Sequence, residues 1–364
     1  MKLLEGFRFA VLCGAALALG ACGGTDRKTG ADEAAIKESP NTPAEALIMQ
    51  AGAALIGKPG PALSFATLDG KTVDLAQSYG RKPVYLKMWA TWCGICRKQM
   101  PGLQTTYERI RNDFTVLSVA TGINESKSDV AKALDQLGAS DVPTAVDDGK
   151  LADYLNLRAT PVHLVIGRDG KVLYIGQSDD ERLDAALAAA AKQPPRVASV
   201  ESTMPKRSAG LTRLPDLALR TIDGNELGLA SNNGGKPTVM VFFLSWCETY
   251  DFPKNVPDLA ARCGDIRKAA ERGNAAGDAR WIEIASSLWV ADDKDIIHYR
   301  DDNGLETPIV FDKSGELFRS FGVRSTPVIL VFGADGGLVA RIDESKPGTD
   351  LHAALDRALS RART

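Results

Sequence analysis

The sequence predicts two consecutive α/β domains, each with a central mixed β-sheet flanked by helices. The chain has 364 residues, enough for about two domains of ~150 residues each. It contains an internal repeat, and in both copies apolar, β-prone runs alternate with helical spacing before a late hairpin. Apolar residues make up 44% of the chain, which is enough to fill the cores of such domains.

Dipeptides that recur in two registers reveal the repeat. Trp92-Cys93 recurs 154 residues later as Trp246-Cys247, and Thr160-Pro161 recurs 166 residues later as Thr326-Pro327. The offset of 154 also relates Asp69-Gly70 to Asp223-Gly224 and Lys82-Pro83 to Lys236-Pro237. The offset of 166 also relates Asp169-Gly170 to Asp335-Gly336. Two copies of one fold are therefore predicted, and the difference between the offsets places 12 additional residues in the second copy.

The elements of the first copy follow from apolar runs and turn signals. Asp69-Gly70 lies in a turn between two short strands, and the apolar run 84–89 predicts the central strand. A helix is expected from Cys93 to about Arg111, bent at Pro101. After it we expect a strand at 114–120, a helix at 129–137, a hairpin of strands 162–166 and 172–175, and a closing helix at 183–191.

Residues 1–21 have the features of a secretory signal peptide, namely an early Lys2, a short apolar run and small residues before a cleavage point. The run Leu19-Gly20-Ala21-Cys22 resembles the bacterial lipobox, in which the cysteine becomes the lipid-modified N-terminus. An ordinary signal peptide with a chance cysteine is the alternative. Gly23 favours the outer membrane over the inner one by analogy with enteric sorting, and Cys13 would be discarded with the leader.

Composition and charge set the remaining boundaries. Residues 22–54 are expected to carry the lipidated cysteine and a flexible tether, with a short helix near 44–53. The domains are expected over 55–193 and 213–364, separated by a polar linker at 194–212. A formal net charge of −2 argues against a nucleic-acid partner, and three scattered histidines argue against a histidine-based metal site.

Cys93 and Cys96 form a Cys-x-x-Cys motif where a strand is expected to end and a helix to begin. The unpaired N–H groups and the dipole of a helix N-terminus stabilise an anion, so Cys93 is the predicted nucleophilic thiolate. It would attack a partner disulfide, and Cys96, one turn along, would resolve the mixed disulfide. This chemistry uses the cysteine pair itself and no further cofactor.

Other interpretations of the pair are possible. A structural bridge would close a very small loop and constrain the unfolded chain little, and a zinc site would need further ligands at a suitable spacing. A copper-binding or metallochaperone module is an alternative, because soft thiolates suit Cu(I). A scaffold with vestigial redox activity is another.

The residues around the motif form a longer pattern. It runs from Val84 through Trp92-Cys93-Gly94-Ile95-Cys96 to Met100-Pro101, with Lys58-Pro59-Gly60-Pro61 upstream and Ala159-Thr160-Pro161 downstream. This pattern resembles the TlpA/ResA-type family of thioredoxin-like disulfide reductases. The resemblance implies a thioredoxin-like fold for both repeats, an active site at Trp92, Cys93 and Cys96, and a cis peptide bond at Thr160-Pro161 in a loop beside Cys93 that helps to hold the substrate chain. Gly94-Ile95 departs from the common Gly-Pro pair, which leaves the reduction potential open.

The same resemblance implies a cellular location and partners. Family members typically reduce disulfides of envelope proteins on the periplasmic side, with electrons from a membrane thiol carrier of the DsbD or CcdA type. For this chain we therefore expect a thiol–disulfide oxidoreductase of the cell envelope, held at the membrane by its lipid anchor and acting as a reductase.

Lys87 lies six residues before Cys93 on the expected central strand, where thioredoxins commonly carry a buried acid. A lysine there could stabilise the thiolate electrostatically, or move a proton if burial lowers its pKa. The alternative is a side chain whose stem packs in the core while its amine reaches water.

The second copy keeps Trp246-Cys247 but has Tyr250 in place of the resolving cysteine and Val241 in place of Lys87. It is expected to be a degenerate thioredoxin-like module that binds a partner or positions the first domain. Prolines at 253 and 257 allow the chain to fold back, so in an oxidising compartment we expect a Cys247–Cys263 disulfide, either structural or redox-active. A free or partner-linked Cys247 is the alternative.

Overall fold

The computed structural model describes residues 42–195, 210–230, 235–249, 252–290, 292–343 and 350–363. Cys13, Cys22 and the predicted signal peptide lie outside these ranges, as does Tyr250. Within them, no helix is both long enough and apolar enough to cross a membrane.

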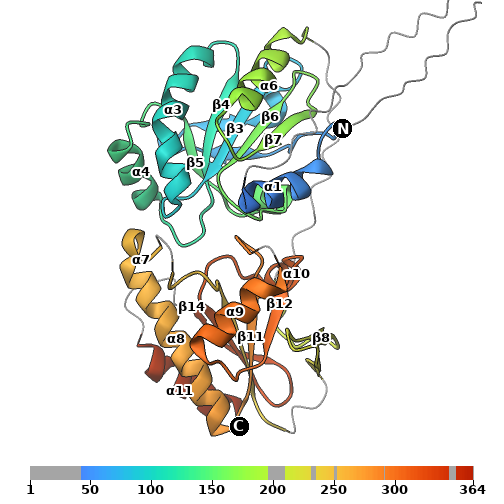
Figure 1. Ribbon diagram of the computed structural model, residues 1–364, viewed down its shortest axis with the longest axis vertical. Helices are drawn as coiled ribbons and strands as arrows, with labels where there is room; N and C mark the ends of the chain where they lie inside the picture. The colour runs from blue at the N-terminus through green and yellow to red at the C-terminus, as the bar shows by residue number, and fades with distance from the viewer. Residues whose placement is uncertain are drawn as a thin grey trace, which may run out of the picture. The chain divides into compact units, whose positions relative to one another are not determined.

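The first domain is built on a mixed sheet, which in the described residues has five strands in the order β5-β4-β3-β6-β7 (Figure 1). The central strand β3 pairs in parallel with β4 and antiparallel with β6. All six residues of β3 are buried, which is why its sequence is a nearly continuous apolar run. The strands are β1 Ser64–Ala66, β2 Thr72–Asp74, β3 Val84–Trp89, β4 Thr115–Ala120, β5 Thr144–Val146, β6 Val162–Ile166 and β7 Val172–Gly176.

Helices cover both faces of this sheet (Figure 1). On one face, α3, α4 and α6 contribute apolar side chains to the cluster that contains Trp89 and Cys96. On the other face, α1, α2 and α5 pack against Leu86, Met88 and Leu164. The helices are α1 Pro43–Ala53, α2 Leu75–Ser78, α3 Gly94–Ile110, α4 Lys127–Gln136, α5 Lys150–Leu155 and α6 Glu181–Lys192.

The second domain repeats this architecture. Its described residues form a five-stranded sheet in the order β12-β11-β10-β13-β14, with β10 parallel to β11 and antiparallel to β13. The predicted fold class, two thioredoxin-like α/β domains in tandem, is therefore confirmed. The strands are β8 Ala218–Arg220, β9 Glu226–Gly228, β10 Thr238–Phe243, β11 Arg280–Ser286, β12 Ile309–Asp312, β13 Val328–Phe332 and β14 Leu338–Asp343.

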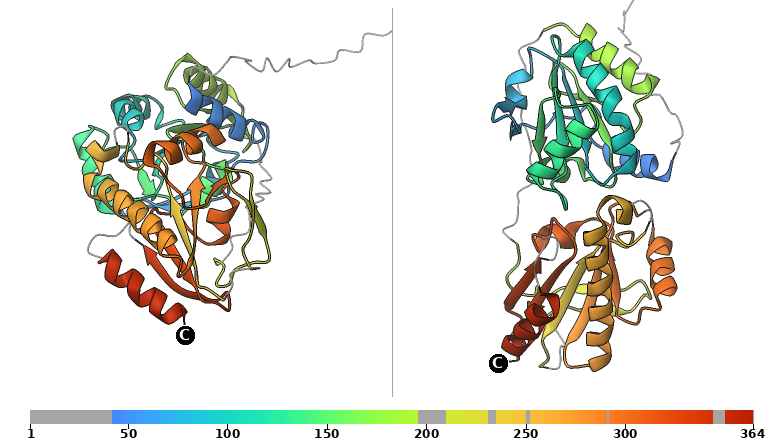
Figure 2. Two further views of the ribbon diagram at one scale, coloured as in Figure 1. Left: turned by 60° about the horizontal axis from the view of Figure 1, so that its bottom comes forward. Right: turned by 90° about the vertical axis from the view of Figure 1, so that its left-hand side faces the viewer.

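The long helix α8 and the C-terminal helix α11 pack together against one face of the second sheet, where Trp281 and Ile329 lie (Figure 2). Leu317 of α10 packs against the other face with Phe242 and Ile282. The helices are α7 Phe252–Asn255, α8 Pro257–Ala276, α9 Asp293–Asn303, α10 Glu316–Ser320 and α11 Leu351–Ala362.

The first-domain elements expected from apolar spacing begin and end within two residues of their predicted bounds. Three short elements were not predicted, namely α2, β5 and α5. Each is three to six residues long, too short for apolar periodicity to become visible.

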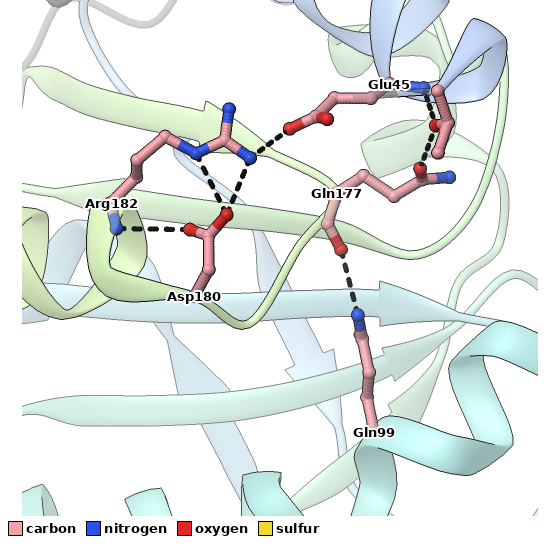
Figure 3. A network of polar contacts seen from close by, with 6 residues as sticks. Glu45, Gln99, Gln177, Asp180 and Arg182 are labelled. Carbon is pink, nitrogen blue, oxygen red and sulfur yellow. Dashed lines mark hydrogen bonds and ion pairs between the residues drawn. The ribbon is translucent and has the colours of Figure 1, made fainter. Parts of the chain in front are cut away.

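The short helix expected near residues 44–53, at the end of the predicted tether, is present as α1, and it is docked on the first domain. Thr42 caps this helix by accepting a hydrogen bond from the backbone N–H of Glu45, and Pro43 occupies its first turn. The helix is docked on the domain by an ion pair between Glu45 and Arg182 with an N···O distance of 2.5 Å, and Asp180 accepts from the same guanidinium at 2.7 Å (Figure 3). A contact between residues so far apart in the chain leaves no local signal in the sequence.

Replacing Arg182 by methionine is expected to destabilise the first domain by about 3 kcal/mol, because it leaves the carboxylate of Glu45 buried without its cation. The Glu45 side chain is 1% exposed. Urea denaturation measures the effect. The matched control is Arg109→Met, which breaks an ion pair with Asp184 whose side chains are 55% and 66% exposed, and which should cost less than about 1 kcal/mol. Equal effects of the two substitutions would contradict the buried character of the Glu45 pair.

Candidate active site

Cys93 and Cys96 lie at the N-terminus of α3 and are joined by a disulfide, with their Cα atoms 5.2 Å apart. Cys93 is the N-cap residue, and its Sγ accepts a hydrogen bond of 3.2 Å from the backbone N–H of Cys96. A donor aimed at this sulfur at the start of a helix stabilises a thiolate there once the disulfide is reduced. As residues, Cys93 is 4% exposed and Cys96 is not exposed at all, so Cys93 is the less deeply buried of the two.

The loop at Thr160-Pro161 lies beside the cysteine pair. Its peptide bond is cis, and the Thr160 carbonyl oxygen is 3.7 Å from Sγ of Cys93. The same carbonyl accepts a hydrogen bond of 3.3 Å from the side-chain amide of Gln177. The structure thus brings Thr160 and Pro161 to the cysteine pair, where the family resemblance places them.

The segment preceding the motif is held by polar contacts from the loop after β4. The indole N–H of Trp92 donates to the carbonyl of Ile123 at 2.8 Å, and the backbone N–H of Thr91 donates to the Glu125 carboxylate at 2.7 Å. The other carboxylate oxygen of Glu125 accepts from the hydroxyl of Thr121 at 2.7 Å. Burial raises the pKa of Glu125, although these donors oppose the shift. Glu125 leaves no signal in the sequence, because its partner Thr91 lies 34 positions earlier in the chain.

Lys87 lies in the core on the α3 side of the sheet. Side chains alternate along a strand, so Lys87 shares a face with Tyr85 and Trp89, which pack in the same apolar cluster as Cys93 and Cys96. The Lys87 side chain is 1% exposed, and its Nζ has no hydrogen-bond partner. The alternative in which the amine reaches water is therefore wrong. Burial lowers the pKa of Lys87 to about 7.

A buried histidine lies opposite Lys87, because His163 of β6 is its antiparallel partner in the sheet. The Tyr85 hydroxyl lies 2.8 Å from Nδ1 of His163, and Oε1 of Gln99 lies 3.1 Å from Nε2. Nε2 of Gln99 donates to the carbonyl of Gln177, which fixes Oε1 as an acceptor (Figure 3). Nε2 of His163 therefore carries the proton, and Nδ1 accepts from the tyrosine.

The resulting network connects the core to the cis-proline loop. Burial lowers the pKa of His163, and the nearby Lys87 lowers it further, so the imidazole is neutral at pH 7. Gln177 links Gln99 to the Thr160 carbonyl and also accepts a hydrogen bond from the hydroxyl of Thr42, the N-cap of α1. His163, Gln99 and Gln177 were not among the site residues predicted from the sequence. The signal available for His163 was its place two residues after Pro161, on a strand that returns antiparallel to Lys87.

The second domain carries a cysteine pair of different spacing. Cys247 follows Trp246 after β10 and forms a disulfide with Cys263 of α8, with a Cα–Cα distance of 6.3 Å. The Thr326-Pro327 peptide bond is cis, and the Trp246 indole donates to the carbonyl of Leu288 at 2.7 Å, as Trp92 does to Ile123. The bridge leaves neither cysteine free in this structure.

Metal ligation was tested against the side chains present. Within the described ranges, no group of three or more histidine, cysteine, aspartate or glutamate residues could hold a metal ion.

Comparison with known proteins decides the family. A family model described as Redoxin matches residues 55–191. A thiol-disulfide oxidoreductase ResA of Bacillus anthracis is 31% identical over 135 residues, which are 36% of this chain and 76% of the relative. This chain belongs to the ResA-type family of thiol–disulfide oxidoreductases. The predicted family and enzyme class are thereby confirmed.

A further curated relative and two solved structures are also similar to parts of this chain. ResA of Bacillus subtilis is 28% identical over 120 residues, covering 33% of this chain and 65% of the relative. Among solved structures, a thiol:disulfide interchange protein DsbE from Chlorobium tepidum is 28% identical, with 37% of this chain and 97% of that chain covered and a TM-score of 0.34. An exposed lipoprotein thioredoxin of Streptococcus pneumoniae is 30% identical, with 36% and 98% covered and a TM-score of 0.32.

Proposed function

We propose that this ResA-type chain is a lipid-anchored reductase of the cell envelope, which passes electrons from a membrane thiol carrier to disulfides of envelope proteins. The observation that carries the proposal is the asymmetry of the cysteine pair. Cys93 is the less deeply buried cysteine, at a helix N-terminus, and its sulfur receives an N–H donor, whereas Cys96 is fully buried one turn behind it.

The catalytic cycle follows from this asymmetry. The Cys93 thiolate attacks one sulfur of a partner disulfide, a Cys93–partner bond forms, and the other partner sulfur leaves as a thiolate that takes up a proton. Cys96 loses its proton and attacks Cys93, which releases the second partner sulfur. The partner gains two electrons and becomes a dithiol, while Cys93 and Cys96 become the disulfide present in the structure.

Lys87 is the group proposed to accept the proton of Cys96. Its amine is buried on the face of β3 that packs toward the cysteine pair, and its pKa of about 7 makes it partly neutral at physiological pH. The neutral His163 next to it adds no competing charge. A proton acceptor is most effective when its pKa lies near the working pH.

The proposed location and electron donor rest on the sequence pattern. A leader ending in Leu19-Gly20-Ala21-Cys22 directs the chain out of the cytoplasm and provides a lipidation point at Cys22, with the outer membrane favoured by Gly23. The family resemblance supplies the donor class, a membrane dithiol carrier of the DsbD or CcdA type. The partner is any envelope protein whose disulfide can approach Cys93 beside the 40% exposed Ile95.

Trapping the mixed disulfide tests the proposal. The trap uses a Cys96→Ser variant in which Cys247 and Cys263 are also replaced by serine, so that neither the resolving thiol nor the second bridge can react with Cys93, and Cys93 should remain bonded to its external partners. We expect this variant, expressed in its native envelope, to accumulate covalent adducts that dithiothreitol releases and that mass spectrometry maps to Cys93.

The matched control carries Cys93→Ser with the same replacements of Cys247 and Cys263, so it keeps one thiol in the motif but loses the nucleophile. It should accumulate few adducts. The proposal is wrong if a correctly folded Cys96→Ser variant captures no envelope protein, or if both variants capture the same amount. Near-ultraviolet circular dichroism reports whether the variants are folded.

A further inference from the structure

The second domain has lost its Cys-x-x-Cys spacing but retains a cysteine pair in the same surroundings. Cys247 is 1% exposed and Cys263 is 8% exposed, and both belong to the buried apolar cluster that also contains Cys93 and Cys96. All four cysteines of the described residues therefore share one cluster.

A small cavity lies beside Cys263, and its lining includes Glu283, Tyr299 and Pro327. The Glu283 side chain is 2% exposed, and its Oε2 has no hydrogen-bond partner. Burial, with the nearby carboxylates of Glu271 and Glu248, raises the pKa of Glu283 to about 8, and Arg267 opposes the shift. The carboxyl is thus neutral near pH 7 and has a proton to donate next to a disulfide sulfur.

The place of Glu283 in the sheet matches that of Lys87. In the first domain Lys87 of β3 pairs with Ser118 of β4, and in the second Val241 of β10 pairs with Glu283 of β11. The ionisable group of the second domain therefore lies on the neighbouring strand, β11, directly beside the position that corresponds to Lys87. Each domain therefore keeps one buried group that can exchange a proton on the face where its cysteines lie.

The segments that precede the two disulfides touch each other. The rings of Trp92 and Trp246 have centroids 5.3 Å apart, and Phe252 contacts both, at 5.8 Å and 5.2 Å. The side-chain amide of Asn255 donates to the Trp92 carbonyl at 3.1 Å. Because Trp92 and Trp246 immediately precede Cys93 and Cys247, these contacts hold the two candidate nucleophile positions near each other within the compact unit Pro40–Thr364.

We propose that the Cys247–Cys263 disulfide is a second redox centre, which the dithiol of Cys93 and Cys96 in the same chain reduces. This inference rests on the proposed function, because it requires Cys93 to act as a nucleophile. Of the two roles left open for this disulfide by the sequence, structural or redox-active, it takes the redox-active one.

The exchange balances in bonds, electrons and protons. The Cys93 thiolate attacks Sγ of Cys247, the Cys247–Cys263 bond breaks, and Cys263 leaves as a thiolate that takes a proton from Glu283. Cys96 then passes its proton to Lys87 and attacks Cys93, which frees Cys247 as a thiolate that takes up a proton from solvent. Two electrons pass from the first pair to the second, so the first pair ends as a disulfide and the second as a dithiol.

The test uses the full chain carrying Cys96→Ser, purified at acid pH, where thiols are protonated and exchange slowly, so that Cys93 starts as a free thiol with the second bridge intact; raising the pH to 7 starts the exchange. Free thiols are alkylated after an acid quench, and peptides are mapped without reduction. We expect a peptide linking Cys93 to Cys247 and an alkyl label on Cys263. The linked fraction should not change on dilution, because the exchange is intramolecular. The double variant Cys93→Ser/Cys96→Ser should keep the Cys247–Cys263 bridge unlabelled.

A separate arm distinguishes failure of this inference from failure of the proposed function. The same Cys96→Ser chain is mixed with an aromatic disulfide such as 5,5′-dithiobis(2-nitrobenzoate). If Cys93 reacts with this reagent but the label stays on Cys93 and the second bridge stays intact, the inference is overturned and the reductase proposal stands. If Cys93 reacts with neither, both are overturned.

The role of Glu283 is tested by Glu283→Gln, with the exposed Glu306→Gln as the matched control. Glutamine cannot give up a proton, so the rate at which the Cys263 label appears should fall about tenfold or more at pH 7. The ratio of the two rates, parent over variant, should approach one above pH 8, because Glu283 itself is then ionised. An unchanged rate, or a ratio independent of pH, would overturn the assignment of Glu283 as the proton donor.

Discussion

Replacing Cys93 by serine is expected to reduce the rate of disulfide reduction by at least about a thousandfold. The substitution removes the sulfur that forms the mixed disulfide, and a serine hydroxyl does not ionise near pH 7 to replace it. Insulin reduction with a dithiol donor measures the rate. The buried site accepts serine with little change of volume, so the fold and the Cys247–Cys263 bridge should persist.

Comparison with Cys96→Ser separates loss of the attacking sulfur from loss of the resolving sulfur. Cys96→Ser in a chain without Cys247 and Cys263 should also lose multiple turnover, but it should still complete the first attack and hold one equivalent of substrate. A Cys93→Ser enzyme that keeps more than a few per cent of the parent rate would show that another sulfur performs the attack.

Replacing Lys87 by methionine is expected to make the first domain more stable and less active. Methionine fills a similar volume without leaving a buried amine unpaired, a defect that costs about 1–3 kcal/mol. Loss of the proton acceptor for Cys96 should reduce turnover by about ten- to a hundredfold. Urea denaturation and insulin reduction measure the two effects, and the exposed Lys132→Met is the control, with little change expected in either.

The pH dependence of the stability gain has a definite direction. The pKa of Lys87 is lowered from 10.5 to about 7, so between these values the unfolded chain binds a proton that the folded chain does not. The parent's free energy of unfolding therefore rises with pH across this window, by at most ~1.4 kcal/mol per pH unit. The advantage of Lys87→Met should be largest below pH 7 and shrink as the pH increases. An advantage that is the same at pH 6 and pH 9 would contradict a buried, titrating amine.

The parts of the fold that the sequence predicted are those with a local or periodic signature. The repeat registers, the apolar run of β3 and the long helix after Cys93 could all be found without the structure, because each leaves a pattern within a short window. The short strand β5 could not. The helix α1 was expected, but its docking on the domain was not, because the Glu45–Arg182 pair joins residues 137 positions apart.

The candidate site divides in the same way. Cys93 and Cys96 are visible as a motif, and the resemblance to a known family supplied Thr160 and Pro161. His163, Gln99 and Glu283 carry no motif, since their importance arises from the strand pairing and helix packing that bring them to the cysteines. A polar residue within an otherwise apolar strand was the available clue for both His163 and Glu283.

The reactivity of the two sulfurs in the reduced first domain tests the central claim most directly. The full chain is reduced, exposed to limiting iodoacetamide at pH 6, and mapped by mass spectrometry. If the helix N-terminus and the Cys96 N–H stabilise the Cys93 thiolate, Cys93 should be alkylated well before Cys96 and faster than free cysteine. Equal labelling of Cys93 and Cys96, at the rate of free cysteine, would contradict the account.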